Sequence, residues 1–472
     1  MLSIQNPKSK IQNRHTSTIC AISTPPGYSG IGIVRLSGPH SVAIAERLFR
    51  PSNGKPLSGQ PGHTLILGRI FDADVLIDEA LVSVMRSPRS YTAEDVVEVN
   101  CHGGIVAVRR TLELMLKAGA RLAEPGEFTK RAFLNGRIDL AQAEAVADLI
   151  GAKTAAGMKA AANQLQGKLS ERIVSLREKL AECLARLEAT IDFPEDEVPE
   201  LGAPGALAVV EETIHEIDAL LSNAHGGKLY RDGVSTVIAG KPNVGKSSVL
   251  NAILNEPRAI VTEEPGTTRD VIVESLELRG IALRLSDTAG IREPGCEIER
   301  LGVERSERAI DDADLVLFVI DLTYPFSAED NRIMERLASK THVIVVANKA
   351  DLDPHPDTSG IEKSFPGRRI IRTSATQGTG IKQLEDAIFK EVTEGAAIAP
   401  EEILVSRLRH QQALENARSA LRSATRTIGN NLSPEFVAVD LREALDSLGE
   451  IVGAVLTDDI LDRIFSEFCI GK

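Results

Sequence analysis

The sequence has few cysteines, no long apolar run and no excess of basic residues. Its five cysteines are far apart in the chain, which argues against a zinc site or a disulfide framework and favours a reducing compartment: Cys20, Cys101, Cys183, Cys296 and Cys469. No apolar stretch approaches the length of a membrane span, and the first fourteen residues lack the apolar core of a secretory signal. We therefore expect a cytoplasmic protein without a membrane anchor.

The balance of charge limits the classes of partner. A formal net charge of -13 and a pI near 5.4 argue against a surface that binds nucleic acid as a whole, because neutralising phosphates requires an excess of Lys and Arg. Any contact with RNA is expected to be local or shared with a partner. Residues 1–14 carry Lys8, Lys10 and Arg14 but no amphipathic pattern, so we expect a disordered tail rather than a transit peptide.

The length of 472 residues predicts two to four domains. From Ile19 to Leu122, β-like and helical stretches alternate, which predicts an α+β amino-terminal domain over residues 1–137. From about Asp139 an apolar stripe that recurs every three or four positions predicts one long helix of a bundle; it comprises Leu165, Leu169, Ile173, Leu176, Leu180, Leu184, Leu187 and Ile191. Helical periodicity returns at Ile403 to Ile428 and at Pro434 to Phe468. We expect a discontinuous helical domain, 138–232 and 393–472, into which an α/β Ras-like P-loop GTPase domain, 233–392, is inserted.

A phosphate-binding loop opens the inserted segment. The run Gly240-Lys241-Pro242-Asn243-Val244-Gly245-Lys246-Ser247 follows a β-branched run, Val234 to Ala239, and precedes a helical pattern that contains Ser248. Glycines in such a loop allow backbone N–H groups to surround phosphates. We expect Lys246 to contact the β and γ oxygens and Ser247 to ligate Mg2+.

Three further motifs follow in the order that a GTPase needs. Asp287-Thr288-Ala289-Gly290 comes after a second apolar strand and is suited to the metal's water shell and the γ-phosphate. In Asn348-Lys349-Ala350-Asp351, the Asp351 carboxylate can accept both guanine donors that adenine lacks, which predicts selection of GTP. Ser374-Ala375 fits a loop behind the base, and Thr267-Thr268 fits the switch segment, with Thr268 completing the Mg2+ shell.

Ile291 stands where many GTPases have a glutamine that orients the attacking water. The chain must therefore align its water by other means. A potassium ion held by Asn243 and the stretch Thr262-Glu263-Glu264-Pro265-Gly266-Thr267 would supply positive charge, and an acid such as Glu299 would position the water. Spacing alone does not decide these two assignments.

Two features near the carboxyl end each allow two readings. Arg407, Arg409, Arg418, Arg422 and Arg426 form a basic stripe, for which a solvated helix face is favoured over a phosphate contact. Cys469-Ile470-Gly471-Lys472 matches a prenylation signal poorly. Its thiol is either uninvolved, which the pattern alone favours, or delivered to a reaction site with Lys472 stabilising the thiolate.

Family-specific segments resolve the reading. The chain resembles the MnmE (TrmE) family of tRNA modification GTPases from Ile19 to Lys472. The segments that carry the resemblance are Thr24-Pro25-Pro26-Gly27, Gly32-Ile33-Val34-Arg35-Leu36-Ser37-Gly38, Glu94-Asp95-Val96-Val97-Glu98, His102-Gly103-Gly104, Pro125-Gly126-Glu127-Phe128, Arg131-Ala132-Phe133-Leu134-Asn135 and the closing Cys469-Ile470-Gly471-Lys472.

The resemblance implies a dimerising amino-terminal domain that binds a tetrahydrofolate derivative, 5-formyl or 5,10-methylene, through Arg35, Glu98, Arg137 and Lys472. Arg137 stands where better-known members have lysine. The resemblance also supports Asn243, Thr262, Glu264 and Thr267 as potassium ligands, Glu299 as the residue that orients the water, and Cys469 as a participant in the modification. His102 is expected to serve loop structure.

The expected function is a potassium-dependent GTPase that acts as a homodimer with an FAD-containing MnmG-type partner. Together they would build an aminomethyl or carboxymethylaminomethyl group on C5 of the tRNA wobble uridine, position 34. The rival functions are a ribosome-assembly GTPase switch, for which no appended RNA-binding module is apparent, and a prenylated membrane switch.

Overall fold

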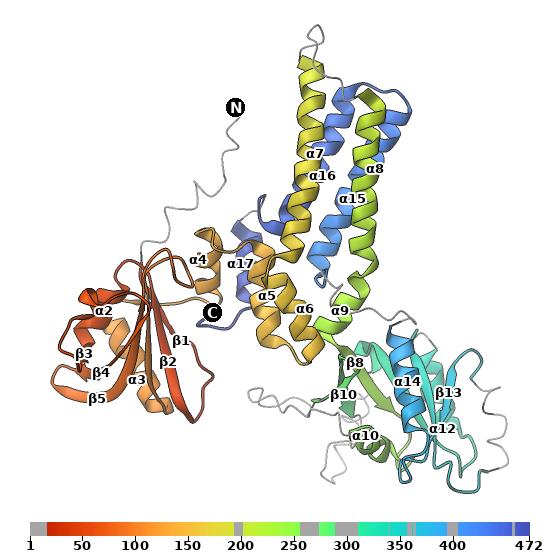
Figure 1. Cartoon of the computed structure of the whole chain (residues 1–472). Coiled ribbons are helices and arrows are strands. Elements are labelled where there is room, and N and C mark those ends of the chain that lie inside the picture. Colours follow the sequence, from red (N-terminus) through yellow and green to blue (C-terminus); the bar gives the residue numbers. More distant parts are fainter. Residues whose placement is uncertain are drawn as a thin grey trace. The chain divides into compact units, whose positions relative to one another are not determined.

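The computed structural model describes residues 17–192, 202–254, 273–287, 310–338, 340–355, 361, 365–393, 405–455 and 458–472. The expected tail of residues 1–14 lies outside this part. Two compact units are present and are described separately: Met1–Ala147, Gln164–Ile217 and Gln412–Lys472 form one, and Asp148–Asn163 and Asp218–Gln411 form the other. The predicted fold class is confirmed, with an α+β part, a helical part and an α/β part (Figure 1).

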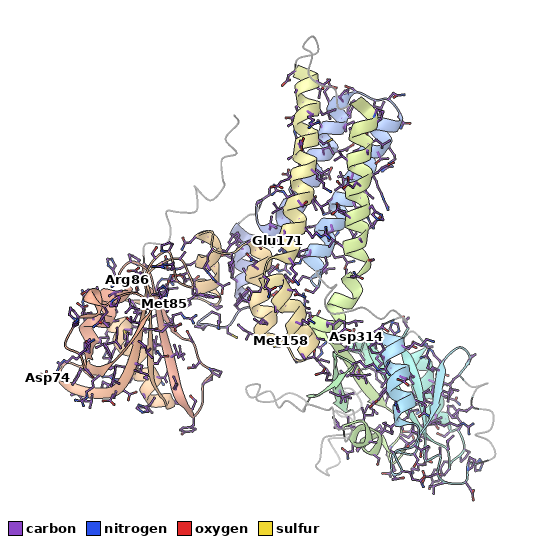
Figure 2. All side chains as sticks on the ribbon, viewed as in Figure 1. Asp74, Met85, Arg86, Met158, Glu171 and Asp314 are labelled. Carbon is purple, nitrogen blue, oxygen red and sulfur yellow. The ribbon has the colours of Figure 1, made fainter. Side chains whose placement is uncertain are left out.

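A seven-stranded sheet forms the α+β part, with strand order β3-β4-β5-β6-β2-β1-β7. The strands are β1 (Ile19–Ile22), β2 (Ser29–Ser37), β3 (Phe49–Pro51), β4 (Thr64–Asp72), β5 (Val75–Met85), β6 (Val96–Gly103) and β7 (Arg121–Leu122). Neighbours are antiparallel, except that β1 and β7 are parallel. Beyond β5, Arg86 (labelled in Figure 2) forms an ion pair of 3.1 Å with Asp95.

Side chains along β2 and β6 point alternately to the two faces of the sheet, which places core residues on one face and candidate functional residues on the other. Val34 and Leu36 of β2 are fully buried in one apolar cluster with Val97 and Val99 of β6. The helices α2 (Ser41–Leu48) and α3 (Ile105–Lys117) contribute to the same cluster. Arg35 and Glu98 alternate with these residues and pair across the strands, so their side chains emerge from the opposite face of the sheet.

A buried ion network fixes α4 (Glu127–Leu134). The Arg131 side chain is 1% exposed and contacts Glu127 at 3.0 Å and Glu94 at 3.1 Å. Glu127 also accepts a hydrogen bond from Arg121. Burial raises the pKa of the Glu127 carboxyl, but hydrogen bonds from Arg121, the Glu124 N–H and Arg131 outweigh it, so the pKa lies below its ordinary value.

The long helices α7 (Lys168–Asp192), α8 (Gly202–Ser222), α15 (Leu408–Gly429) and α16 (Pro434–Val452) run alongside one another (Figure 1). The predicted stripe is buried from Leu169 to Leu184. Its first member is not part of this helix, because α6 (Ala155–Leu165) ends at Leu165 and Gly167 adopts a φ of +91°. Leu187 and Ile191 are half-buried, and the residues from Phe193 onward lie outside the described part.

The pattern from Pro434 to Phe468 forms two helices, because Gly453, with a φ of +79°, caps the end of α16. The second helix is α17 (Asp458–Ser466). Its apolar side chains Leu461, Ile464 and Phe465, together with Phe468, pack with α4 and α5 (Leu140–Gly151). Within the described residues, no helix is long and apolar enough to cross a membrane.

The α/β part contains a six-stranded sheet with strand order β13-β12-β11-β8-β10-β9. Its strands are β8 (Val234–Ala239), β9 (Val273–Leu278), β10 (Ile281–Asp287), β11 (Leu315–Asp321), β12 (Val343–Asn348) and β13 (Arg369–Arg372). All neighbours are parallel except β9 and β10. One face packs against α10 (Lys246–Leu254) and α14 (Ile381–Val392), and the other against α12 (Ala328–Leu337).

The chain enters and leaves the α/β part at adjacent points. Gly227 lies in α9 (Ala224–Asp232), directly before β8, and a Cβ atom there would come within 1.9 Å of the Val405 carbonyl oxygen. Nearby, Arg407 forms a 2.6 Å ion pair with Asp148. The first arginine of the basic stripe is therefore held in a buried ion pair.

At the start of β11, Asp314 (labelled in Figure 2) accepts a hydrogen bond of 2.9 Å from the Ser235 N–H.

Removing the Arg131 side chain would weaken the amino-terminal domain. Arg131→Met leaves two acids without their shared cation, and we expect a loss of about 3 kcal/mol of protection, the usual cost of breaking a buried pair. Hydrogen exchange of peptides from β2 and α4 would measure this loss domain by domain. Arg69→Met, which removes an exposed ion pair with Glu79, is the matched control and should change protection by less than about 0.5 kcal/mol. Equal protection in the two variants would contradict the role of the network.

Candidate functional site

The phosphate-binding loop has the expected strand, loop and helix around it. Gly240 and Gly245 have φ angles of +147° and +94°. A Cβ atom would come within 2.3 Å of the Val319 carbonyl oxygen at Gly240, and within 2.3 Å of the Asn348 amide nitrogen at Gly245. Both positions therefore require glycine for conformation and for space. The side chains of Asn243, Ser247 and Ser248 are exposed at the loop and at the start of α10.

Lys246 is buried at the first position of α10. Its Nζ donates hydrogen bonds to the carbonyl oxygens of Gly240, at 2.9 Å, and Lys241, at 2.8 Å. The ammonium group is thus held over the loop instead of extending into solvent. The positive end of the α10 dipole lies at the same place, and the two together favour an anion.

Asn348 joins the loop to the two predicted base-binding segments. Its amide nitrogen donates to the Val244 carbonyl oxygen at 3.0 Å. Its amide oxygen accepts from the Thr373 hydroxyl at 3.3 Å and from the Ala375 N–H at 3.2 Å. Asn348 therefore acts as a brace between the phosphate-binding loop, the end of β12 and the turn after β13.

Lys349 supplies a second link to the loop. Its Nζ donates to the Asn243 carbonyl oxygen at 3.2 Å and forms an ion pair of 2.5 Å with Asp321, the last residue of β11. Burial raises the pKa of Asp321, but hydrogen bonds from Lys349 and Thr323 outweigh it, so that the net pKa is lowered and the carboxylate stays charged. Sequence reasoning did not find Asp321, although an acid at the end of a third parallel strand was visible.

The base-binding candidates lie on the turns after β12 and β13. Asp351 is exposed, directly beyond Asn348 and Lys349. Ser374 is buried and its N–H donates to the Thr379 carbonyl oxygen at 2.9 Å. Asp351 is therefore accessible, whereas Ser374 and Ala375 form part of a hydrogen-bonded loop.

Several predicted nucleotide and metal ligands lie outside the described residues. These are Thr262, Glu263, Glu264, Pro265, Gly266, Thr267, Thr268, Thr288, Ala289, Gly290 and Glu299. Asp287 is described by its main chain only, at the end of β10, where its Cα pairs with that of Ile238. Asp287 therefore lies beside Ile238 of the parallel strand β8, two residues before Gly240.

A second site forms where the last residues of the chain reach the outer face of the amino-terminal sheet. Arg35 Nε donates to Glu98 Oε1 at 2.7 Å, and Arg35 Nη1 donates to the Gly471 carbonyl oxygen at 3.3 Å. The Ser23 hydroxyl donates to the same carbonyl oxygen at 3.1 Å. Burial and the neighbouring Arg35 lower the pKa of Lys472, while Glu98 opposes them. Residues 35, 98 and 472 are thereby brought together from three distant segments.

Two aromatic residues complete this second site. The guanidinium carbon of Arg35 lies 5.3 Å from the ring centre of Tyr91 and 5.6 Å from that of Phe128. The guanidinium carbon of Arg137 lies 4.7 Å from the Tyr91 ring centre, so Tyr91 is shared by two cations at cation–π distance. All four predicted residues therefore gather here. Tyr91 and Phe128 were missed, although Phe128 stands in a family segment.

Main-chain contacts hold the tail in place. The Gly126 and Phe128 N–H groups, at the start of α4, donate to the carbonyl oxygens of Cys469 and Lys472 at 3.4 and 3.1 Å. Gly471 adopts a φ of +96°, and a Cβ atom there would lie 2.2 Å from the Ile22 carbonyl oxygen. The side chain of Cys469 is exposed. His102 forms an exposed ion pair of 2.6 Å with Asp78.

The α/β fold with its phosphate-binding loop and guanine-selective motif defines a GTPase domain that is embedded in a larger chain. A family model described as the amino terminus of the GTP-binding protein TrmE matches residues 18–137, and one for the MnmE helical domain matches residues 140–469. The chain therefore belongs to the MnmE family of tRNA modification GTPases, as the sequence predicted.

Full-length relatives agree with this assignment. The tRNA modification GTPase MnmE of Desulforamulus reducens is 47% identical over 458 residues, which cover 96% of this chain and 99% of that protein. The MnmE proteins of Moorella thermoacetica and Bacillus subtilis are 49% and 46% identical, with 96% of this chain and 99% and 100% of those proteins covered.

Solved structures with similarity include a variant of Era from Aquifex aeolicus bound to GDP and aluminium fluoride. It is 31% identical over 40% of this chain and 66% of that chain, with a TM-score of 0.28. The G domain of the FeoB iron transporter of T. maritima is 26% identical over 34% of this chain and 98% of that chain, with a TM-score of 0.24.

Exchanging the Asp351 carboxylate for an amide would change which base is bound. Asp351→Asn presents an N–H group to the guanine N–H donors, so we expect the Kd for GDP to rise by at least about 100-fold, the scale expected when a binding site loses a polar match to its ligand. Titration with a fluorescent guanine nucleotide would measure it. Xanthosine diphosphate, which has an oxygen in place of the 2-amino group, should bind the variant better than the parent. Asp353→Asn, an exposed acid two residues further on, is the control.

Proposed function

We propose that this chain hydrolyses GTP while it takes part, with an FAD-containing MnmG-type partner, in installing an aminomethyl or carboxymethylaminomethyl group on C5 of the tRNA wobble uridine, position 34. The carbon would come from a tetrahydrofolate derivative, 5-formyl or 5,10-methylene. FAD is assigned to the partner. The observation that carries the proposal is the meeting of the Cys469-to-Lys472 tail with Arg35 and Glu98 on the sheet face.

The tail site has the chemistry that a reduced folate requires. Glu98 Oε1 is occupied by Arg35, whereas Oε2 has no hydrogen-bond partner among the described residues and would accept from the pterin amino group and ring N–H. Arg35, Arg137 and Lys472 would hold the carboxylates of the glutamate tail. Tyr91 and Phe128 add aromatic faces against which a planar ring would pack.

Cys469 is suited to act beside this ligand. Its main chain is fixed by the start of α4 while its thiol remains exposed. We assign it a part in the modification, for which its thiolate would be the reactive form. A fixed backbone with an accessible side chain is what a delivered reactive group needs.

For GTP hydrolysis, Lys246 would neutralise charge on the β and γ oxygens. Ser247, exposed at the first turn of α10, would ligate Mg2+ together with Thr268. Asn243 has a φ of +66° and an exposed side chain, so its amide oxygen would be available to K+, with Thr262, Glu264 and Thr267 as further ligands. Glu299 would orient the water. The ion would supply the positive charge that other GTPases obtain from an arginine.

The proposal includes a homodimer. Exposed apolar side chains gather near the start of β2 and of α3: Tyr28, Ile31, Ile105 and Val106. The two elements touch, because a Cβ atom at Gly32 would lie 2.2 Å from Val108. An exposed patch of this kind favours association between two amino-terminal domains, and hydrolysis would be activated when two GTPase domains meet.

Potassium should accelerate GTP hydrolysis and sodium should not. We expect kcat to be at least about tenfold higher in KCl than in NaCl at equal ionic strength, because an ion that fits stabilises charge only in the transition state. Phosphate release under saturating GTP would measure it. Asn243→Ala should abolish the difference while leaving GDP binding intact. Equal rates of the parent in the two salts would remove K+ from the proposal.

Glu98→Gln should lose affinity for 5-formyltetrahydrofolate by about 100-fold, because an amide cannot accept two hydrogen bonds without also presenting donors. Equilibrium dialysis with radiolabelled folate would measure this. Cys469→Ser is the matched comparison: it should bind folate as the parent does, but should leave the wobble uridine unmodified in a complemented deletion strain.

The same experiments separate the rival functions. A ribosome-assembly switch has no use for a reduced folate, so a parent chain that ignores it would favour that function. Full modification in the Cys469→Ser strain would exclude the thiol. An intact mass increased by a prenyl group on Cys469 would favour the membrane switch.

A further inference from the structure

Lys241, the second residue of the phosphate-binding loop, points its side chain away from the loop towards α12. Its Nζ lies 2.6 Å from Asp330 Oδ2 and 3.0 Å from the Ser327 hydroxyl. Its side chain is 19% exposed, while that of Asp330 is 3% exposed. A largely buried ion pair thus links the loop to α12, a helix that is distant from it in the sequence.

Asp330 already has a local function that fixes its position. Ser327 and Asp330 form a capping box at the start of α12, in which Asp330 Oδ2 accepts from the Ser327 N–H and hydroxyl, both at 2.9 Å. Its other oxygen, Oδ1, is buried with no hydrogen-bond partner in the described structure. The charge of this carboxylate is therefore balanced by Lys241 and by the helix dipole.

The Lys241 main chain takes part in the hydrogen bonds of the loop. Its carbonyl oxygen accepts from Lys246 Nζ at 2.8 Å, so the Lys241 main chain is part of the hydrogen-bonded loop that would surround the phosphates. Two residues further on, the Asn243 carbonyl oxygen is held by Lys349, whose partner is Asp321. Two buried acids of the β11-to-α12 segment therefore hold the loop on either side of Pro242.

We propose that Lys241 and Asp330 are a positioning pair that keeps the phosphate-binding loop in its anion-binding conformation. This inference rests on the proposed GTP-binding function. The pair acts on the part of the loop that surrounds phosphates common to GDP and GTP, so it contributes equally to both ligands. It holds the loop without touching the nucleotide.

The test is a double-mutant cycle on the full chain with Lys241→Met and Asp330→Asn. Each variant should raise the Kd of fluorescent GDP and of a non-hydrolysable GTP analogue by the same factor, about tenfold. The KM for GTP should rise with kcat unchanged, because the lost interaction is equal in the ground and transition states. The double variant should be no weaker than either single one, since the second change removes a contact that is already lost.

Two comparisons distinguish positioning from a purely structural role. Lys241→Arg keeps the charge and should return both Kd values to within about threefold of the parent. Lys382→Met, an exposed lysine on α14, should bind as the parent does. The proposal is overturned if Lys241→Met and the nearly isosteric Asp330→Asn lower the nucleotide-free melting temperature but keep parental Kd values, or if their effects add. A parent chain that bound no guanine nucleotide would refute the proposed function instead.

Discussion

The main chain of Gly471 lies against Ile22 with no space for a side chain, and its carbonyl oxygen accepts hydrogen bonds from Ser23 and Arg35. Those contacts join residues that are separated by nearly the whole sequence. Because α17 packs on α4 through Phe465 and Phe468, the chain delivers its last four residues to one defined place. The second site exists only while this contact holds, since neither Lys472 nor Cys469 would otherwise reach the sheet.

In the nucleotide site, too, residues from distant segments hold the main chain of a short loop in place. Side chains hold the carbonyl oxygens of the phosphate-binding loop. From outside the loop, Asn348 holds Val244 and Lys349 holds Asn243, and within it Lys246 holds Gly240 and Lys241. A loop fixed in this way has already lost most of the conformational entropy that binding would otherwise cost. Residues identified from sequence as ligands are therefore partly structural, and Asn348 is the clearest example.

Secondary structure was predicted best from segments whose apolar residues follow a single helical or strand periodicity. The phosphate-binding loop, the strand Val234 to Ala239 before it and the helix after it follow directly from apolar patterns and glycine positions. Prediction of helix ends was wrong where the backbone conformation of a single residue ends a helix. Gly167 and Gly453 interrupt apolar stripes that continue on either side. An apolar stripe reports which face is buried, but a left-handed glycine can end one helix and start another without disturbing it.

The two sites differed in how far sequence reasoning could go. Asp351 and Lys246 belong to short motifs whose chemistry is local, whereas Arg35, Glu98 and Lys472 acquire meaning only when distant segments meet. Family resemblance supplied that set, and physical reasoning alone would have given Arg35 and Glu98 a folding role. Tyr91 and Asp321 remained hidden because their partners are separated from them in sequence.

Gly227 and Val405, on the two sides of the GTPase segment, are in main-chain contact. A domain whose two attachment points lie together can be deleted and replaced by a very short linker. Its insertion into an ancestral helical protein would likewise have left the connections between the helices unchanged. The junction that makes the domain separable is formed by the main chain at Gly227 and Val405.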